Sequence, residues 1–399
     1  MGDWVESRFT GLGMDGGPVP RRAFDPAVAL HAALGPEGRT GSGAGWDRDS
    51  ARDACHGELI ERALCRPLPR DFSILSSHRE WPLDEPAVEP SRWVLFHPEQ
   101  YALPGFPYEP FTEDAVVRWT CCRDAGTGQP WWVPEELVHL EARPGERHRL
   151  GRSASTGLSC GRGPVPVLLR GLQEVIERDA LTGAWWGRYP LEEWPEDEVF
   201  GLLDPSIPPR LRRPNLRWRF YRARSPFSQH VALARCDGED GEGWAVRFGS
   251  ACRETLAASW AKALLEAAQC IPYVRHLRRE RGGERGPPAD FAAHALHYTL
   301  HPEQMACTVA EDPAPRVPLV ASPEETLEVL RERLGRPVLF RDLTPPGISS
   351  EVPGWRVLRV VVPGLQPLHG DHRFPHLGGP LWAPRGWSDW LDSPPHPFA

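Results

Sequence analysis

Apolar residues recur with the 3.6-residue period of a helix in three long segments of the chain. These segments are residues 46–64, 165–186 and 253–277. Such a period indicates a helix that buries one face in a core. The first segment should begin near Asp47, because aspartate suits a helix N-terminus, and should end before Pro67. We therefore expect three long amphipathic helices.

Shorter apolar segments between them are rich in β-branched and aromatic residues, which predicts strands. Residues 116–122 and 131–134 flank a glycine-containing turn and should form a hairpin. Further strands are expected at 91–96, 218–221, 231–235 and 357–362. Residues 151–163 and 278–288 should be loops, because glycines, small residues or charges predominate there. Helices and hairpins mix without a regular strand–helix alternation, so the pattern predicts an α+β fold.

Composition excludes several classes of protein. The chain has 399 residues, and 40% of them are hydrophobic, which is ample for a packed interior. The formal net charge is −8 with the two signs interspersed, so we expect no nucleic-acid partner. No signal peptide or long apolar stretch is present, so we expect a cytoplasmic protein with no membrane partner. The nine cysteines contain no Cys-x-x-Cys pair, which indicates reduced, mostly buried thiols.

The sequence Glu-x-x-Glu-Arg occurs twice, and each copy lies inside a predicted helix. Residues three apart share a helical face, so each copy places two carboxylates side by side. The two pairs are Glu58 with Glu61 and Glu174 with Glu177. Adjacent carboxylates on a half-buried face repel unless a cation lies between them, and their hard oxygens suit Mg²⁺. Solvated helix faces with Glu–Arg ion pairs are the alternative, and the repetition weighs against it.

Two further features could carry chemistry, and each also has a simpler explanation. His369, His372 and His376 follow the last predicted strand and could converge on a metal ion. The neighbouring glycine and prolines indicate a loop with no fixed spacing, and no cysteine lies near, so we favour an ordinary loop. Cys160 precedes the second acidic helix, where a nucleophile is plausible, but a small buried residue is the simpler interpretation.

Four stretches in a fixed order resemble the YcaO family. They are the first acidic helix, residues 155–180 with Ser-Thr-Gly-Leu-Ser-Cys-Gly and the second acidic motif, Ala-Leu-Leu-Glu-Ala-Ala-Gln at 263–269, and Val-Val-Val-Pro-Gly-Leu at 360–365. Any one alone would be a weak indication, but the ordered set is specific. The resemblance predicts an N-terminal extension at 1–40 and a YcaO-like domain at 41–399. It implies mixed or antiparallel sheets and packed helices that carry acidic faces.

The resemblance implies ATP-dependent activation of a peptide backbone amide. In the best-known members, a Cys, Ser or Thr side chain of a precursor peptide attacks the preceding carbonyl, ATP phosphorylates the oxygen of the adduct, and loss of phosphate leaves a thiazoline or oxazoline. Other members make thioamides or amidines with the same ATP chemistry. We therefore expect a cyclodehydratase component of a ribosomal-peptide modification pathway. Its expected cofactors are ATP and Mg²⁺.

The resemblance also implies which residues form the site. The residues that match the family's ligands for magnesium and nucleotide phosphates are Glu58, Glu61, Glu174, Glu177, Glu266 and Gln269. Their carboxylates are expected to bind the metal, because carboxylates can face a triphosphate only through bridging Mg²⁺. Arg178 is expected either to contact phosphate or to pair with its neighbouring carboxylates, and Arg62 has the same alternatives.

The chain ends in Ser-Pro-Pro-His-Pro-Phe-Ala, which resembles the proline-rich terminus of azoline-forming members. By this resemblance Pro395 and Pro397 hold an extended segment that delivers the carboxylate of Ala399 to the active site, where all three residues serve catalysis. The family's usual final residue is proline. An exposed, frayed terminus is the alternative. Removal of the last residues is expected to abolish ring formation with little effect on the fold.

The chain departs from the family pattern at several nucleotide-contacting positions. It has Ala44 where many members have lysine, and Ala54, Pro166 and Ile271 in place of serine, glutamate and arginine. These departures favour a second hypothesis, a non-catalytic YcaO-like scaffold subunit. The retained acidic residues weigh against it, because acidic pairs without a metal are a standing cost.

The expected partners also follow from the resemblance. They are a precursor peptide, a protein that binds its leader, a flavin dehydrogenase of the same pathway, and a second copy of the chain in a homodimer. The leader-binding protein is expected because only about forty residues precede the YcaO-like sequence.

Overall fold

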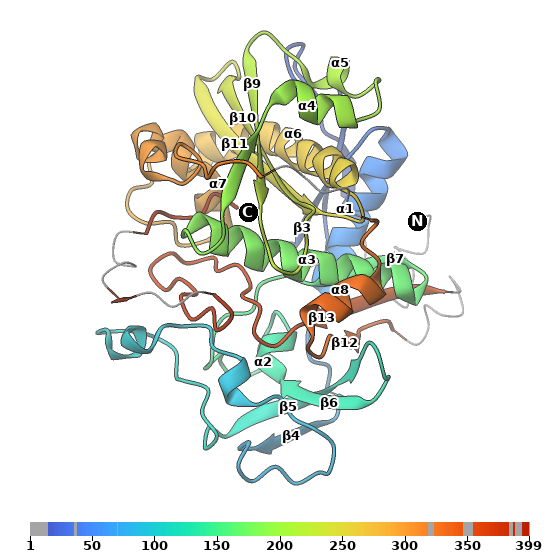
Figure 1. Cartoon of the computed structure of the whole chain (residues 1–399), viewed down its shortest axis with the longest axis vertical. Coiled ribbons are helices and arrows are strands. Elements are labelled where there is room, and N and C mark those ends of the chain that lie inside the picture. Colours follow the sequence, from blue (N-terminus) through green and yellow to red (C-terminus); the bar gives the residue numbers. More distant parts are fainter. Residues whose placement is uncertain are drawn as a thin grey trace.

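A computed structural model describes residues 15–35, 38–69, 71–317, 323–345, 354–382, 386–387 and 393–398 (Figure 1). Its strands form three sheets, and all the pairings between named strands are antiparallel. Helices pack between and against the sheets, which confirms the predicted α+β class.

The first sheet has the order β1 (Asp15–Pro18), β2 (Ala29–Leu34), β3 (Thr40–Gly45). The second has the order β11 (Trp244–Cys252), β10 (Val231–Glu239), β9 (Leu216–Ala223), β8 (Leu191–Trp194). The third has the order β4 (Ser73–Ser76), β5 (Val117–Asp124), β12 (Leu339–Asp342), β13 (Trp355–Val361), β7 (Leu158–Arg162), and β6 (Pro130–Pro134) also pairs with β5.

The longer helices are α1 (Arg48–Leu64), α3 (Pro164–Trp185), α6 (Leu256–Arg281), α7 (Phe291–Leu300) and α8 (Leu327–Leu334). The shorter ones are α2 (Glu135–Val138), α4 (Glu196–Leu202) and α5 (Pro208–Leu211), with 3₁₀ turns at Pro90–Arg92, Pro98–Ala102 and Pro302–Cys307. In Figure 1, α3 crosses the middle of the molecule, between the second sheet above it and the third sheet below it. It carries much of the largest apolar core cluster.

Helix α1 starts where the sequence predicts, because the Asp47 side chain accepts a 2.8 Å hydrogen bond from the backbone N–H of Ser50. The helix packs closely on β3. A Cβ atom added at Gly43 would lie 2.2 Å from the carbonyl oxygen of Ala51, so only glycine permits this approach. The glycines of β3 therefore bring α1, with its acidic pair, directly against the sheet.

Helix α6 packs along β10 and β11. A Cβ atom at Gly249 would lie 2.2 Å from the backbone nitrogen of Ala267, so β11 also meets its helix at a glycine. Because α3 contacts β11 as well, both α3 and α6 pack on the same strand, and each carries its predicted metal-ligand residues near the middle of the helix.

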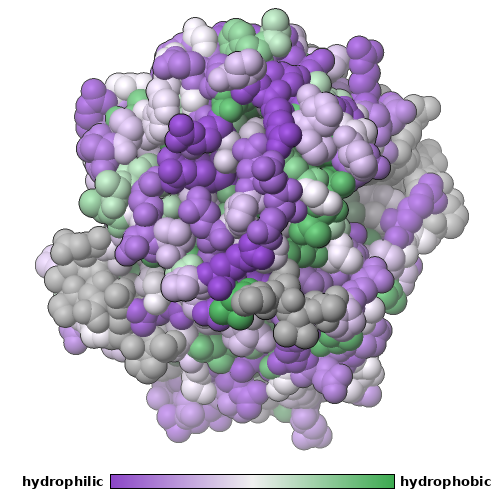
Figure 2. Space-filling model, turned by 45° about the horizontal axis from the view of Figure 1, so that its top comes forward, coloured by the Kyte–Doolittle hydropathy of each residue, from purple (hydrophilic) through white to green (hydrophobic). Residues whose placement is uncertain are grey.

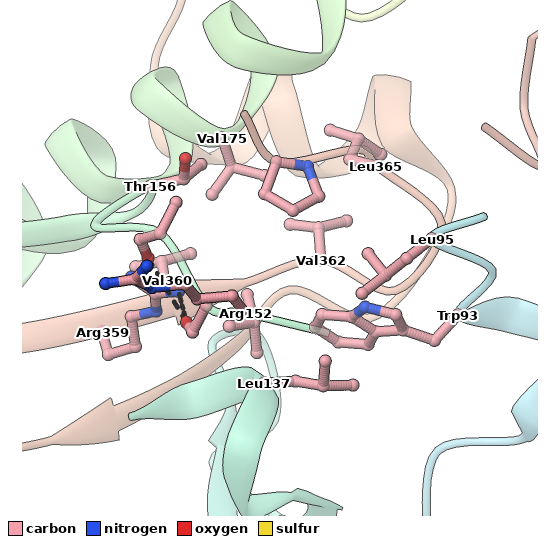
Figure 3. Close-up of a pocket in the computed structure, with 14 residues that line it drawn as sticks. Trp93, Leu95, Leu137, Arg152, Thr156, Val175, Arg359, Val360, Val362 and Leu365 are labelled. Atoms are coloured by element: carbon pink, nitrogen blue, oxygen red, sulfur yellow. Dashed lines mark hydrogen bonds between the residues drawn. The ribbon is translucent and has the colours of Figure 1, made fainter. Parts of the chain in front are cut away.

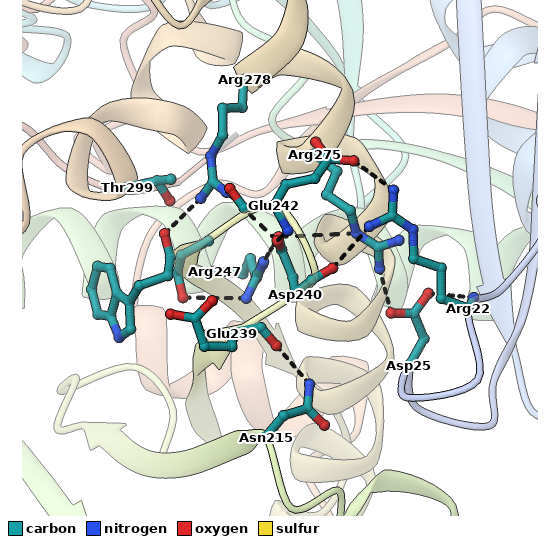
Figure 4. A network of polar contacts seen from close by, with 12 residues as sticks. Arg22, Asp25, Asn215, Glu239, Asp240, Glu242, Arg247, Arg275, Arg278 and Thr299 are labelled. Carbon is teal, nitrogen blue, oxygen red and sulfur yellow. Dashed lines mark hydrogen bonds and ion pairs between the residues drawn. The ribbon is translucent and has the colours of Figure 1, made fainter.

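A buried ionic network fixes the N-terminal strands to the rest of the protein (Figure 4). Asp240, in the turn after β10, pairs with Arg247 and with Arg278 of α6. Arg275 of α6 pairs in turn with Asp25, which lies between β1 and β2. Buried charges of this kind are tolerated only when they are paired, so Asp25, in the predicted N-terminal extension, is packed against α6.

The predicted hairpin is present as β5 and β6, and the three long helices are confirmed within a few residues. The predicted strand at 91–96 is wrong. Its backbone is bonded by loops instead: the Gln366 amide donates to the carbonyl of Val94 at 2.9 Å, and the N–H of Gly378 donates to that of Leu95. The predicted loops are partly wrong, since residues 158–162 form β7 and α6 continues to Arg281.

Hydrophilic residues predominate on the face drawn in Figure 2, and hydrophobic residues gather there in separate groups. No described helix combines the length and the apolar character that a membrane crossing requires.

Candidate active site

Three helices bring the predicted acidic residues to neighbouring positions. Glu58 and Glu61 lie on α1, Glu174 and Glu177 on α3, and Glu266 and Gln269 on α6. Helix α1 packs on β3, α6 packs on β3 and β11, and α3 packs on β11. The sheets therefore place the polar faces of the three helices around one region, which we call the acidic site. The side-chain contacts of these six residues define it.

Glu58 and Gln269 meet at a serine of β3. The backbone N–H of Ser42 donates to Glu58 Oε2 at 2.7 Å, and Gln269 Nε2 donates to the Ser42 hydroxyl at 2.6 Å. Arg62 pairs with Glu58 Oε1 at 2.7 Å, which is the ion pair that the sequence offered as one alternative for this arginine. The first and third acidic helices are thus joined through Ser42.

Glu61 lies between the first two helices. Burial and the negative charges of Glu174 and Glu58 together raise the pKa of its carboxyl group to about 8, against a hydrogen bond from Cys160. Cys160 itself has a pKa raised well above its usual value by burial and by Glu61. A thiol held protonated is a poor nucleophile, which supports the interpretation of Cys160 as a small, largely inert residue.

Glu177 is the most enclosed member of the set, with 3% of its surface exposed. The Ser250 hydroxyl donates to its Oε1 at 2.7 Å, and the N–H of Cys252 donates to its Oε2 at 3.0 Å. Both donors lie on β11, so the strand orients this carboxylate. Its neighbour Glu174 has a pKa raised to about 7, mainly by burial, although Arg178 opposes the shift.

Glu266 accepts a hydrogen bond of 3.3 Å from the N–H of Ser250 and pairs with Lys262 at 3.2 Å. Burial raises the pKa of its carboxyl group, but the positive charges of Lys262 and Arg178 outweigh burial and hold that pKa below its usual value. Arg178 lies 3.7 Å from Glu177 and 3.9 Å from Glu174, both on α3. Because its charge also lowers the pKa of Glu266 on α6, it is the cation shared by the second and third acidic helices.

The electrostatics of this acidic site fit a divalent cation. Burial is the main cause of the raised pKa values of Glu61 and Glu174, and the negative charges of neighbouring glutamates raise both further against the opposing arginines. A Mg²⁺ ion takes oxygen ligands from one or two carboxylates together with substrate phosphates, and it would remove this repulsion. The donor set is entirely of that kind. The residues present therefore fit Mg²⁺.

Arg359 is a charged residue near this site that sequence reasoning missed. It lies in the apolar strand β13 with 3% of its surface exposed, and its positive charge lowers the pKa of Glu174. Its Nη2 donates to the Ser153 hydroxyl at 3.1 Å, whereas Nε and Nη1 have no hydrogen-bond partner in the described structure. The signal that could have revealed it is a lone arginine within a run of valines.

Arg359 also lines a small cavity of about 30 Å³ beneath α3 (Figure 3). Val175 of α3 and Trp93 line other parts of its wall. A buried guanidinium with two free donor groups beside a cavity is suited to an anion.

The C-terminal segment is buried, so the alternative of a frayed terminus is wrong for the residues described. Pro395 and Pro397 are both buried, and the carbonyl of Pro395 accepts hydrogen bonds from Trp185 Nε1 at 2.9 Å and from the Tyr298 hydroxyl at 2.6 Å. These donors lie on α3 and α7, and Figure 1 places the C-terminal end between the two helices. Ala399 lies outside the described residues.

The C-terminal segment also comes within electrostatic range of the acidic site. The pKa of the next residue, His396, is lowered well below its usual value, first by burial and also by neighbouring histidines and the positive charge of Arg178. Phe398 packs edge-on against Trp185, with 3% of its surface exposed.

Comparison with known families gives one match that covers most of the chain. The model described as YcaO cyclodehydratase, ATP- and Mg²⁺-binding, matches residues 42–366. This match confirms the resemblance noted in the sequence. A search of curated protein sequences gives no significant match.

Solved structures with a similar fold include a heterocyclase in complex with substrate and cofactor, at TM-score 0.67 and 16% identity. That match covers 90% of this chain but only 50% of the heterocyclase, so the chain spans half the length of this relative. YcaO from Methanopyrus kandleri, bound with AMPPCP and Mg²⁺, is similar at TM-score 0.59 and 20% identity, over 91% of this chain and 89% of the other.

The Escherichia coli microcin synthetase McbBCD complex with pro-MccB17 bound is similar at TM-score 0.57 and 14% identity, over 88% of this chain and 87% of that one. At these identities the likeness establishes the fold.

Proposed function

The chain belongs to the YcaO family, and we propose that it uses ATP and Mg²⁺ to cyclodehydrate Cys, Ser or Thr residues of a precursor peptide to thiazolines or oxazolines. The observation that carries the proposal is the acidic site itself. Three helices gather their carboxylates in one region, and burial together with neighbouring glutamates raises the pKa values of Glu61 and Glu174. The similar solved structure of a heterocyclase in complex with substrate and cofactor supports the same chemistry.

In this proposal the metal ligands are the carboxylates of the three helices. They are Glu58, Glu61, Glu174, Glu177 and Glu266. Bound Mg²⁺ would neutralise the charge that develops on the transferred phosphoryl group. Gln269, fixed by Ser42, and Arg178, fixed between two carboxylates, would contact the nucleotide phosphates. Arg359 supplies a further positive charge beside Glu174.

The reaction balances without a redox partner. The peptide thiol or hydroxyl adds to the carbonyl carbon before it and loses its proton. The resulting amide oxygen takes the terminal phosphoryl group of ATP, which leaves ADP. Departure of phosphate and loss of the proton on nitrogen then form the C=N bond of the ring. Phosphorylation is needed because an amide oxygen is otherwise a poor leaving group.

We assign the proton transfers to the C-terminal segment. Pro395 and Pro397 would hold it extended, and the carboxylate of Ala399 would accept a proton from the attacking group or from the adduct nitrogen. Support comes from the burial of both prolines and from the electrostatic effect of Arg178 on His396. This assignment favours ring formation over thioamide or amidine formation.

A non-catalytic scaffold is the second candidate, and one observation favours it. Ala44 and Ile271, which replace the family's usual lysine and arginine, are buried members of an apolar cluster in this chain. At these two positions, apolar side chains that pack in the core replace polar side chains that would contact the nucleotide in other family members. Arg359 and Lys262 lie close enough to the acidic site to supply positive charge in their place.

The proposed partners are the precursor peptide, a protein that binds its leader, and a flavin dehydrogenase that would oxidise the rings, with a homodimer as the proposed assembly.

The test is to incubate the chain with Mg²⁺, ATP, a candidate precursor encoded beside its gene and the neighbouring leader-binding protein. The proposal expects release of ADP and phosphate together with loss of one water per ring, measured by mass spectrometry. Exchange of an amide oxygen for sulfur in the peptide would favour thioamide chemistry, loss of water at a peptide amine rather than at Cys, Ser or Thr would favour amidine chemistry, and absence of nucleotide binding would favour the scaffold.

A further inference from the structure

Three buried histidines from separate segments meet where the C-terminal segment enters the core. His294 lies on α7, His369 follows β13, and His396 belongs to the C-terminal segment. One ring nitrogen of each lies within 4.8 Å of those of the other two. The rings of His294 and His396 stack at a centroid distance of 3.9 Å, and the ring of His369 lies 4.5 Å from that of His396. None of the three has a role in the proposed reaction.

Hydrogen bonds identify which ring nitrogen carries the lone pair in two of the three histidines. His294 Nδ1 lies 2.6 Å from the carbonyl oxygen of His396, and a carbonyl only accepts, so Nδ1 carries the hydrogen and Nε2 carries the lone pair. His396 Nε2 lies 2.8 Å from the carbonyl oxygen of His369, so its lone pair is on Nδ1, where it accepts a 3.3 Å hydrogen bond from the N–H of Phe398 that a metal ion would displace.

His369 has no hydrogen-bond partner at either ring nitrogen in the described structure, and His294 Nε2 has none either. A buried polar group without a partner is destabilising, so some ligand for these nitrogens is expected. Burial keeps the rings neutral: it lowers the pKa of His294 to about 3 and that of His369 well below its usual value. Neutral rings can donate lone pairs to a metal without first losing a proton.

We propose that His294, His369 and His396 bind one Zn²⁺ ion, which fixes the C-terminal segment to α7 and to the loop after β13. Two of the three ligands donate their other ring N–H to a backbone carbonyl, which is how metal-bound histidines are usually oriented. Imidazole nitrogen suits Zn²⁺, whereas Mg²⁺ prefers oxygen, so this ion is distinct from the metal of the acidic site.

The geometry requires a modest closure. Zinc–nitrogen bonds of about 2.0–2.1 Å place tetrahedral ligands roughly 3.4 Å apart, compared with the separations of up to 4.8 Å present here. Rotation of the stacked rings would supply the difference. His372 repeats the pattern, because its Nε2 lies 3.1 Å from the carbonyl of Ser393 and its Nδ1 has no described partner. Its ring lies 5.8 Å from that of His369 and 6.0 Å from that of His294, which makes it a candidate for the fourth ligand.

The test uses the full chain without a histidine tag, stripped with a chelator, in the absence of ATP and peptide. Zinc content after gel filtration and the visible spectrum of bound Co²⁺ are the two measurements. We expect one equivalent of Zn²⁺ and an intense Co²⁺ spectrum typical of tetrahedral nitrogen ligation, both unaffected by excess Mg²⁺. Absence of stoichiometric metal, or an octahedral Co²⁺ spectrum, would overturn the proposal and leave a cluster of neutral histidines without metal.

Variants locate the ion. His369→Gln should weaken Zn²⁺ binding at least tenfold, while His276→Gln, which changes an exposed histidine of α6, should leave it unchanged. Equal affinity in wild type and His369→Gln would contradict the site. If His369→Gln does not fold, the Co²⁺ spectrum of the wild-type chain still decides. The acidic site takes no part in this measurement, so its outcome is independent of the proposed cyclodehydration.

Discussion

The Ser250 hydroxyl donates a 2.7 Å hydrogen bond to Glu177, and this contact joins β11 to the second acidic helix. The N–H of the same serine donates to Glu266 of the third acidic helix. One residue of the strand thus sets the positions of two carboxylates from different helices. Strand β11 is therefore part of the acidic site, although it contributes no carboxylate.

Substitution Ser250→Ala should weaken Mg²⁺–ATP binding about 3- to 10-fold and lower the free energy of unfolding by about 1 kcal/mol, because Glu177 loses a buried donor. Calorimetric titration and denaturant unfolding measure the two effects. Ser228→Ala is the matched control, since Ser228 is also a buried hydroxyl that donates to a glutamate, Glu325. It should cost similar stability and leave nucleotide affinity unchanged. Equal losses of affinity in both variants would mean that Ser250 acts only on the fold.

Mg²⁺ should stabilise the protein more at about pH 8.5 than at about pH 6. The folded-state pKa values of Glu61 and Glu174 are raised to about 8 and about 7, from a usual 4.5. Ionisation of these two groups therefore leaves the free energy of unfolding unchanged below about pH 4.5. As the pH rises, it lowers that free energy increasingly, until both groups are ionised above about pH 8. Mg²⁺ removes that cost by binding the ionised form, and it must displace protons at the lower pH.

Thermal unfolding with and without Mg²⁺ at both pH values measures this effect. A magnesium-induced rise in melting temperature that is the same at both pH values would show that these two carboxyl groups do not bind the ion. In Glu61→Gln the difference between the two pH values should shrink, because one of the titrating groups is gone.

Loss of the C-terminal segment should abolish ring formation, but the expectation that the fold is unaffected needs correction. Phe398 is buried against Trp185, so removal of Pro397–Ala399 should also lower the free energy of unfolding, by about 2–4 kcal/mol. Phe398→Ala is the control, because it removes the same ring and keeps the terminal carboxylate. If the carboxylate acts in catalysis, Phe398→Ala retains far more activity than the truncation, measured as dehydration per ATP consumed. Equal activity of Phe398→Ala and the truncated chain would mean that the C-terminal segment contributes only to packing.

The buried arginine of β13 gives a prediction of its own. Arg359→Gln should weaken ATP binding tenfold or more, since it removes a buried positive charge beside Glu174. Arg152, an exposed arginine that lines the same cavity, is the control, and Arg152→Gln should change affinity less than about threefold. Calorimetry decides, and equal effects of the two substitutions would contradict a phosphate-facing role for Arg359.

The sequence predicts the parts of the site that repeat and misses those that depend on tertiary contact. Glu58, Glu61, Glu174 and Glu177 are visible because two helices repeat one pattern. Ser42, Ser250 and Arg359 are not, since a single polar residue in a strand has no periodic signal and its role depends on which helix packs beside it. The metal hypothesis for His369 looked within one loop, whereas the structure brings it beside His294 and His396, 75 residues upstream and 27 downstream in the chain.

The strand errors have the same origin. Residues 93–96 are apolar enough for a strand, but the carbonyls of Val94 and Leu95 accept hydrogen bonds from Gln366 and Gly378, which are distant in the sequence. Conversely, β7 lies in a glycine-rich stretch that local propensity assigns to a loop, and its pairing with β13 overrides that propensity.

The central claim is that the gathered carboxylates hold Mg²⁺–ATP, and calorimetry of Glu177→Gln tests it most directly. Glu135→Gln is the matched control, because Glu135 is a buried glutamate of α2 paired with Arg143 at 2.7 Å, outside the acidic site. The account predicts that the wild-type chain and Glu135→Gln bind Mg²⁺–ATP alike and that Glu177→Gln binds at least tenfold more weakly, because it loses one negative metal ligand. Equal binding by Glu177→Gln and the wild-type chain, or no binding by the wild-type chain with any partner present, would contradict it.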